Sequence, residues 1–281
     1  MIVTRFAPSP TGFLHPGHAF AAITAYESGD DFLLRIEDID QGRARENFVE
    51  AIFLDLKWLG LSWDEPVLRQ SRRLPAYKAA LEKLEARGVV YPCFCTRKEI
   101  AEEIARAKEA PHIDLAAPRP GGPDGPLYPG TCRALTAAER AARIAAGDSY
   151  ALRLDCRKAA AAVGPLSFTE GSRNVTVDPL RFGDVVVARR EMPTSYHLAV
   201  VVDDAFQNVT LVTRGEDLLA STHIQRVLQA LLGLPAPAYA HHRLILDAAG
   251  KKLSKRDGAE TLAALREAGA TPSDIRARIS L

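Results

Sequence analysis

The chain has 281 residues, of which 47% are hydrophobic and 25% are charged, the ordinary composition of a globular protein with one large or two small domains. Its formal charge of +1 excludes a uniformly basic surface, so any nucleic acid must meet a local basic patch. No apolar run approaches the ~20 residues of a membrane helix, and no export signal begins the chain. We therefore expect a cytoplasmic protein that makes no membrane contact.

The first ninety residues alternate between strand and helix patterns. Residues 2–7 predict a short strand, and after a turn rich in proline and glycine a helix is expected over about 18–27. The apolar stretch 31–38 predicts a buried strand, and 46–60 and 75–88 predict amphipathic helices that end at a glycine. This alternation favours an α/β fold with a Rossmann-like, doubly wound parallel sheet.

The pattern changes near residue 91. A helix is expected over 96–110, followed by a loop rich in proline and glycine, a short helix, and a half-buried strand over 149–156. Long apolar stretches return in 184–218, which we interpret as buried strands, and two weak helices are expected after Gly233. The predicted parts are the first half of the Rossmann-like domain (1–90), an inserted subdomain (91–175), the second half (176–233) and a C-terminal segment (234–281).

The turn "HPGH" places two histidines at the start of the first predicted helix. His15 and His18 fall on one side of a helix N-terminus, where unpaired N–H groups and a partial positive charge favour phosphate. Gly17 would let a nucleotide approach closely. The alternative is a proline-stiffened loop with two surface histidines.

A second motif, "GKKLSKRDGA", carries four cations within residues 251–256. Such clusters are usually solvated surface. The serine between lysines and the flanking glycines instead favour a loop that clamps a polyphosphate, for which lysine is a compact charge with three donors.

Together, "HPGH" and "KLSKR" resemble the HIGH and KMSKS signatures of the class I aminoacyl-tRNA synthetases. The stretches "RFAPSPTG", "RIEDID", "TRGEDL" and "SYHLAVVVDD" resemble the glutamyl and glutaminyl members of that class. The resemblance implies an ATP-dependent ligase in which His15, His18 and Lys255 are catalytic. It assigns ATP binding to His15, Gly17, His18, Lys252, Leu253, Ser254, Lys255 and Arg256.

The amino-acid pocket can be argued from charge. Glutamate carries one cation and two anions, so a selective pocket needs an acceptor for its ammonium group and guanidinium groups for its carboxylates. Arg5, Glu37 and Arg214 supply these charges at the ends of predicted strands. The alternative is that Arg5 and Glu37 pair across neighbouring strands. By resemblance, the residues that bind L-glutamate are Arg5, Phe6, Ala7, Pro8, Ser9, Glu37, Tyr196 and Arg214.

Three cysteines are candidate metal ligands. Cys93 and Cys95 form a C-x-C motif, and Cys132 lies beyond a loop with little core of its own, which a structural metal would stabilise. Three thiolates with one oxygen or nitrogen ligand suit Zn²⁺. The synthetase-like enzymes that charge queuosine in tRNA have a similar C-x-C and Y-x-x-x-C arrangement, which implies Tyr128 as the fourth ligand. His112 is the alternative, and Cys156 is expected in the core.

The length of the chain differs from that of a tRNA-charging glutamyl enzyme. It ends about 25 residues beyond Arg256, where such enzymes continue into a domain that reads the anticodon. The resemblance therefore implies a monomeric catalytic core that activates L-glutamate with ATP and Mg²⁺ and transfers it to queuosine at the wobble position of tRNA(Asp). The alternatives are a truncated glutamyl-tRNA synthetase that charges the 3′ end of tRNA(Glu), and a non-catalytic paralogue that binds adenylate or RNA.

Overall fold

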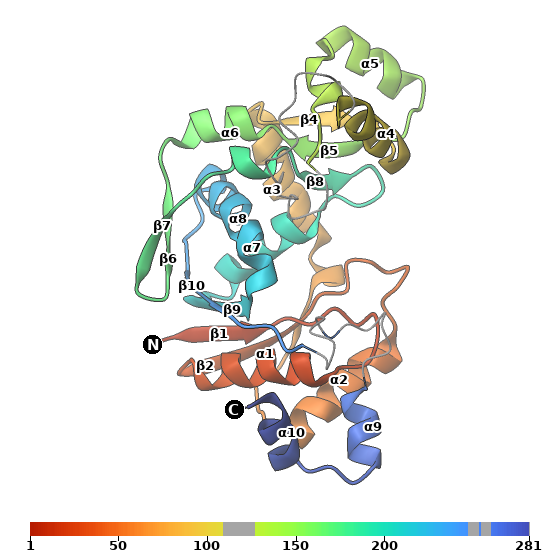
Figure 1. The fold of residues 1–281 in the computed structure, drawn as a ribbon. Coiled ribbons are helices and arrows are strands. Elements are labelled where there is room, and N and C mark those ends of the chain that lie inside the picture. The colour runs from red at the N-terminus through yellow and green to blue at the C-terminus, as the bar shows by residue number, and fades with distance from the viewer. Residues whose placement is uncertain (109–126, 247–252, 254–259, 281) are drawn as a thin grey trace.

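The computed structural model describes residues 1–108, 127–246, 253 and 260–280, and Figure 1 shows an elongated molecule with sheets stacked along its length. One parallel sheet has the order β1-β2-β3. Its strands are β1 (Val3–Phe6), β2 (Asp31–Ile36) and β3 (Leu68–Arg69). All four residues of β1 are buried, as expected of a central strand.

Four helices pack against this sheet, and two of them come from the last twenty described residues of the chain. They are α1 (Pro16–Glu27), α2 (Glu46–Trp58), α9 (Leu262–Glu267) and α10 (Pro272–Ile279). The 3₁₀ turn η1 (Gln70–Arg72) and α3 (Leu74–Ala86) follow β3, and Leu84 of α3 packs in a separate cluster with Leu198 and Leu228. Helix α1 begins two residues before the predicted start, because the fixed φ of Pro16 suits the first helical position. Ile275 and Ile279 of α10 pack in one cluster with Ile23 of α1, so the last described helices belong to the first half of the fold.

A second sheet has the order β7-β6-β10-β9 and continues the first. Its strands are β6 (Ser167–Glu170), β7 (Arg173–Thr176), β9 (Leu211–Gly215) and β10 (Ala238–His242), and α8 (Leu219–Leu232) connects β9 to β10. The start of β9 lies beside β1, since Thr210 N donates to Val3 O over 3.0 Å. The carboxyl ends of β1 and β9 therefore meet at a crevice, the usual ligand position in doubly wound sheets, and the predicted fold class is confirmed.

The third sheet is antiparallel, with the order β4-β5-β8, and lies at the upper end of Figure 1. It comprises β4 (Val90–Cys93), β5 (Ala151–Leu154) and β8 (Val186–Arg189), with α4 (Arg97–Lys108), η2 (Thr131–Ala134), α5 (Ala137–Ala145), α6 (Cys156–Val163) and η3 (Leu180–Phe182) around it. Cys156 is buried at the start of α6, as predicted for a core residue, although the strand before it ends at Leu154. Nearly all of the β6–β7 hairpin falls within the predicted insertion 91–175, yet β6 pairs with β10.

One predicted strand is wrong. The stretch "SYHLAVVVDD", which we interpreted as buried strand, is α7 (Tyr196–Phe206), followed by β9 and the 3₁₀ turn η4 (Glu216–Leu218). Seven of its residues are buried, from His197 to Asp204, so it lacks the polar face that marks an amphipathic helix. A short apolar run of this kind does not distinguish a buried helix from a buried strand. Among the residues described here, no helix is both long and apolar enough to cross a membrane.

Candidate active site

The two motif histidines form the start of α1. His15 is the N-cap residue, and its backbone N–H donates to His18 Nδ1 over 3.2 Å. Because Nδ1 accepts this bond, the neutral His18 ring carries its proton on Nε2. The two ring centroids lie 3.7 Å apart. A side chain at Gly17 would place its Cβ 3.0 Å from His15 Cε1, so the His15 ring would have to shift by a few tenths of an ångström to admit it.

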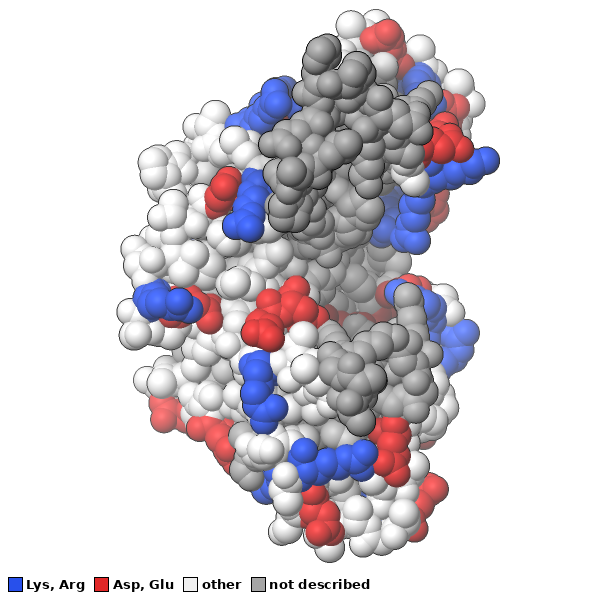
Figure 2. All heavy atoms as spheres, viewed as in Figure 1, with Lys and Arg blue, Asp and Glu red and all other residues white. Residues whose placement is uncertain are grey.

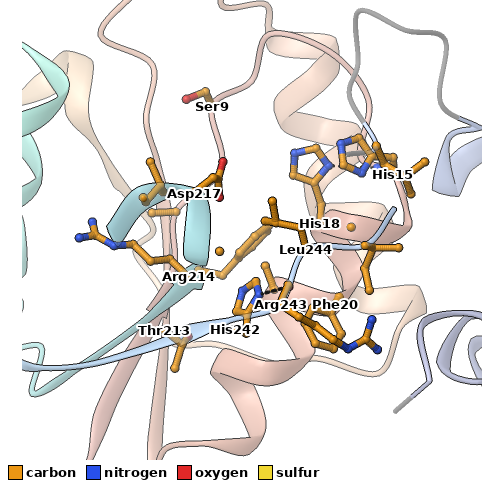
Figure 3. Close-up of a pocket in the computed structure, with 18 of the residues that line it drawn as sticks. Ser9, His15, His18, Phe20, Thr213, Arg214, Asp217, His242, Arg243 and Leu244 are labelled. Carbon is orange, nitrogen blue, oxygen red and sulfur yellow. Dashed lines mark hydrogen bonds between the residues drawn. The ribbon is translucent and has the colours of Figure 1, made fainter. Parts of the chain in front are cut away.

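A cavity of about 530 Å³ opens between these histidines and the ends of β1 and β9. Figure 3 shows His15 and His18 on one side of it and Arg214 on the other. The predicted site residues that line it are Arg5, Phe6, Ala7, Ser9, His15, Gly17, His18, Glu37, Tyr196, Arg214 and Leu253. The volume is that of a small-molecule site. Pro8 is not among the lining residues, and its carbonyl accepts a bond from Glu37 N over 3.0 Å.

Beneath one wall of the cavity lies a buried network of four charges. Arg5 Nε donates to Asp204 Oδ1 over 3.1 Å, and Arg35 Nη2 donates to the same oxygen over 2.7 Å. Arg35 also lies 3.6 Å from Glu37 Oε1. The ion pairs therefore join Arg5 to Asp204 and Glu37 to Arg35, and the alternative of an Arg5–Glu37 pair is wrong.

Burial and the neighbouring arginines together set the charge of these carboxyl groups. Burial raises the pKa of Glu37 from 4.5 to about 7, although Arg35 and Arg5 oppose the shift. Burial also acts to raise the pKa of Asp204, but Arg5 and Arg35 outweigh it and hold that pKa below its usual range. Asp204 is thus a fixed anion, whereas Glu37 gains or loses its charge near neutral pH.

Arg214 has a different environment. It is 6% exposed, and four neutral acceptors hold its guanidinium group. Nε donates to His241 Nε2 over 3.2 Å, and Nη2 donates to Thr222 Oγ1 over 2.6 Å. Nη1 donates to Gln225 Oε1 over 2.8 Å and to the Tyr196 hydroxyl over 3.3 Å. In the described part of the chain no carboxylate pairs with this cation, so the cavity holds a buried positive charge suited to an anionic ligand.

The cysteine cluster lies at the edge of the antiparallel sheet. The sulfur atoms of Cys93, Cys95 and Cys132 all lie within 4.8 Å of one another. The hydroxyl of Tyr128 is 3.6 Å from Cys95 Sγ and accepts a bond from Cys132 N over 2.8 Å. Three sulfurs and one phenol oxygen therefore converge, and the cluster can bind a metal ion. The alternative ligand, His112, lies outside the described residues.

Comparisons with known proteins give the family. Residues 1–280 match the family described as tRNA synthetases class I (E and Q), catalytic domain. The chain is 49% identical to the glutamyl-Q tRNA(Asp) synthetase of Rhodobacter capsulatus, over all of both chains. It is 39% identical to the glutamate–tRNA ligase of Aquifex aeolicus, over 98% of this chain and 55% of the relative. The chain belongs to the class I tRNA synthetases (E and Q).

Solved structures of this family agree with the fold. A glutamate–tRNA synthetase from Elizabethkingia anophelis superposes with a TM-score of 0.75 at 29% identity, over 96% of this chain and 59% of the other. A glutamate–tRNA ligase from Elizabethkingia meningosepticum, solved in complex with its amino acid, gives a TM-score of 0.74 over similar spans. The chain therefore spans well under two thirds of these structures.

Most of the second synthetase motif lies outside the described residues, namely Lys252, Ser254, Lys255 and Arg256. Leu253 is described: it lines the cavity, and its backbone N–H donates to Ile245 O over 3.1 Å. The two synthetase motifs, far apart in the sequence, thus reach one cavity through Leu253 and His15. The roles predicted for the four cationic and hydroxyl residues stay predictions.

Sequence reasoning missed several residues of this synthetase cavity. Phe20 packs edge-to-face against His242 with 4.9 Å between ring centroids, and the guanidinium carbon of Arg243 lies over the Phe20 ring, 4.7 Å from its centroid. Leu244 and Ile245 complete this wall. Apart from Phe20, these residues stand at the carboxyl end of β10, where ligands bind in parallel sheets, but no strand was expected there because only two weak helices were predicted after Gly233. Nothing in the sequence marked Arg35 or Asp204 as partners of the predicted pocket residues.

Two further cavities adjoin the synthetase cavity. One, of about 710 Å³, shares Ser9, Glu37 and Tyr196 with it. The other, of about 400 Å³, shares Tyr196. Arg97 of α4 and Arg189 of β8 line both. Figure 2 shows a notch between the upper and lower parts of the molecule with Lys and Arg side chains on each side of it. We call these two cavities the cleft; Arg97 and Arg189 are exposed cations at it, and Glu37 and Asp40 line it as well.

Proposed function

We propose that this chain activates L-glutamate with ATP and transfers it to queuosine at the wobble position of tRNA(Asp). The observation that carries the amino-acid assignment is the buried Arg214, which has only neutral acceptors in the described structure. It shares a cavity with Glu37 and with the histidines at the start of α1. A glutamine side chain would leave this cation without an anion, at a cost of roughly 1.5–3 kcal/mol per lost charge-assisted bond.

The first step requires no nucleophile from the protein. An α-carboxylate oxygen of glutamate forms a bond to the α-phosphorus of ATP, and the bond from that phosphorus to the β-phosphate oxygen breaks, which releases pyrophosphate. Glu37 holds the ammonium group, and Arg5 and Arg214 hold the side-chain carboxylate. His15, His18 and Lys255 place positive charge or donors on the phosphates, so catalysis comes from orientation and electrostatic stabilisation. Mg²⁺ bound with ATP would neutralise phosphate charge.

The second step delivers glutamate to the nucleic acid. A hydroxyl oxygen of the queuosine cyclopentene diol forms a bond to the activated carbonyl carbon and gives up its proton to solvent. The bond from that carbon to the phosphate oxygen breaks, and AMP leaves with its electron pair. The cleft lined by Arg97 and Arg189 gives the nucleoside a path to Tyr196. The R. capsulatus relative, matched over its whole length, bears the name of this reaction, which favours queuosine over the 3′ end of tRNA(Glu).

Aminoacylation of purified tRNA(Asp) with labelled glutamate tests this function. We expect incorporation only into tRNA(Asp) that carries queuosine, and none into unmodified tRNA(Asp) or into tRNA(Glu). Charging of tRNA(Glu) would instead support a truncated glutamyl-tRNA synthetase. Exchange of labelled pyrophosphate into ATP with glutamate alone separates the first step from the second, and absence of both activities would support the non-catalytic paralogue.

Three structural assignments accompany this proposal. The ligands of a structural Zn²⁺ are Cys93, Cys95, Cys132 and Tyr128, and the donor set fits a closed tetrahedral site. The inserted subdomain spans 91–175, between the two halves of the catalytic domain (1–90 and 176–233), with a C-terminal segment at 234–281. The chain acts as a monomer, which sedimentation at micromolar concentration would check.

A further inference from the structure

Arg214 is held at its Nε by a relay of two side chains on neighbouring strands. Glu170 ends β6, His241 lies in β10 opposite Arg214 of β9, and all three lie in one sheet. Glu170 Oε2 lies 2.6 Å from His241 Nδ1, and Glu170 Oε1 accepts the backbone N–H of His241 over 2.8 Å. The imidazole is thus gripped through both its ring and its backbone, and its side chain is only 4% exposed.

The chemistry of Arg214 fixes the protonation of His241. A guanidinium Nε–H only donates, so His241 Nε2 must offer a lone pair at 3.2 Å. The ring proton then lies on Nδ1 and is donated to Glu170. Burial lowers the pKa of His241, and the charges of Arg214 and His242 act in the same direction, whereas Glu170 opposes them. The balance keeps the ring neutral at pH 7.

This arrangement places the His241 ring between the Glu170 carboxylate and the Arg214 guanidinium group. Direct pairing of Glu170 with Arg214 would neutralise the cation before a substrate carboxylate reaches it. The neutral His241 ring instead presents Nε2 to Arg214 as an uncharged acceptor. Thr222, Gln225 and Tyr196 add three further neutral acceptors, so four of the five N–H groups of Arg214 are used and the cation keeps its full charge.

We propose that Glu170 and His241 are positioning residues that make Arg214 selective for a carboxylate over a carboxamide side chain. This inference rests on the proposed function, since it concerns the side chain of the amino acid activated there. Neither residue lines the cavity, so both act through Arg214. L-glutamate and L-glutamine carry the same ammonium and α-carboxylate groups, so effects on Glu37 cancel in the ratio of their kcat/KM values.

The test is pyrophosphate exchange with each amino acid in Glu170→Gln and His241→Gln. We expect the glutamate-to-glutamine ratio of kcat/KM to fall about tenfold in each variant, the effect of one lost orienting hydrogen bond near a charged group, with KM for ATP unchanged. His223→Gln is the matched control. His223 is a half-buried histidine of α8 that contacts Phe168 and Phe182 and forms no bond to Arg214. The glutamate-to-glutamine ratio of kcat/KM in His223→Gln should equal that of the wild type.

A second measurement needs no activity. ¹⁵N NMR of the imidazole nitrogens, with His241 assigned by its loss in His241→Gln, should show the Nδ1–H tautomer at pH 7. An Nε2–H tautomer, or a ratio unchanged in both variants, would overturn the inference. Failure of the wild type to exchange pyrophosphate with glutamate, together with the expected tautomer, would instead contradict the proposed function and leave the relay intact.

Discussion

The three buried arginines around the amino-acid pocket differ in what neutralises them. Arg5 and Arg35 share the carboxylate of Asp204, so they form a compact unit whose charge is partly balanced in the absence of substrate. Arg214 has no such partner in the described structure and depends on hydrogen bonds to neutral groups. An incoming carboxylate therefore gains most from Arg214, since that cation is desolvated and not yet paired.

Arg214→Gln tests this difference. The variant keeps a side chain that can hydrogen-bond but removes the charge, so kcat/KM for glutamate should fall by roughly 10–100-fold, as expected for a lost charge-assisted bond. The value of kcat/KM for glutamine should fall much less, because its carboxamide makes no charge-assisted bond to Arg214. The measurement is pyrophosphate exchange at saturating ATP. Equal losses for both amino acids, with unchanged thermal stability, would contradict a role in reading the side chain.

Glu37 predicts a pH dependence of glutamate binding. It faces Arg35, Arg5, Asp204 and Asp203, and burial raises its pKa to about 7. An ammonium group needs the ionised form, so the affinity for glutamate should fall up to tenfold per pH unit below pH 7 and level off above it. Equilibrium binding of glutamate without ATP, between pH 6 and 8, measures this. Glu37→Gln should bind weakly with no such slope.

The raised pKa of Glu37 makes stability change with pH in the opposite direction to glutamate affinity. Because the pKa of folded Glu37 lies above its ordinary value of 4.5, the folded protein binds that proton more tightly than the unfolded chain does. The contribution of Glu37 to the free energy of unfolding is therefore fully present below pH 4.5 and is lost as the pH rises through 7. Substrate affinity rises across the same window, so this residue favours function at the expense of stability.

At the scale of single elements, predictability from sequence follows the pattern of burial. Helix α2 was predicted over 46–60 because it has one apolar face, and it spans Glu46–Trp58. Helix α7 was misread as strand because its Val200–Val202 run is surrounded by protein. Its last turn can bury two carboxylates because Asp203 and Asp204 accept bonds from arginines of other elements. Such long-range partners are invisible in one sequence.

The cysteine cluster makes a prediction for the element it holds together. Removal of one thiolate leaves too few ligands for a tetrahedral site, so Cys132→Ser should lower bound zinc from about one equivalent toward none. It should also expose the chain around η2 to proteolysis, since this part has only a small apolar cluster. Metal content by atomic absorption gives the direct measurement.

Cys156→Ser is the matched control for this prediction. Cys156 is as buried as Cys132, but it lies in a different cluster and its Sγ donates to Gly183 O over 3.0 Å. Zinc content should remain at the wild-type value. Equal zinc in the wild type and in Cys132→Ser would contradict the assigned ligand. Tyr128→Phe, which removes only the phenol oxygen, tests the fourth ligand by the same measurement.

At the scale of the whole molecule, topology brings the two arginines of the predicted amino-acid pocket to one cavity. Strands β1 and β9 are distant in sequence but adjacent in the sheet, so Arg5 and Arg214 reach one crevice. The cleft beside it was not predicted, because Arg97 and Arg189 come from an inserted helix and an antiparallel strand. No spacing rule relates such elements; only the folded arrangement brings them together.

Arg97→Glu and Arg189→Glu test whether this cleft receives the nucleic acid. Each change replaces an exposed cation by an anion at a cavity that also contains Tyr196. If phosphates of the tRNA strand lie here, KM for tRNA(Asp) should rise about tenfold. The slope of log KM against log salt should also become shallower, by about 0.7 for each lost contact to single-stranded RNA. Pyrophosphate exchange without tRNA serves as the internal reference.

Arg173→Glu is the control for this prediction, because Arg173 is an exposed residue of β7 that lines none of the three cavities. It changes the net charge by the same amount, so a general loss of attraction to RNA would affect all three variants equally. A local contact would weaken transfer only in the cleft variants. Transfer that falls equally in Arg173→Glu would show that the cleft arginines act through net charge alone, and the acceptor nucleoside would then need another path to the site.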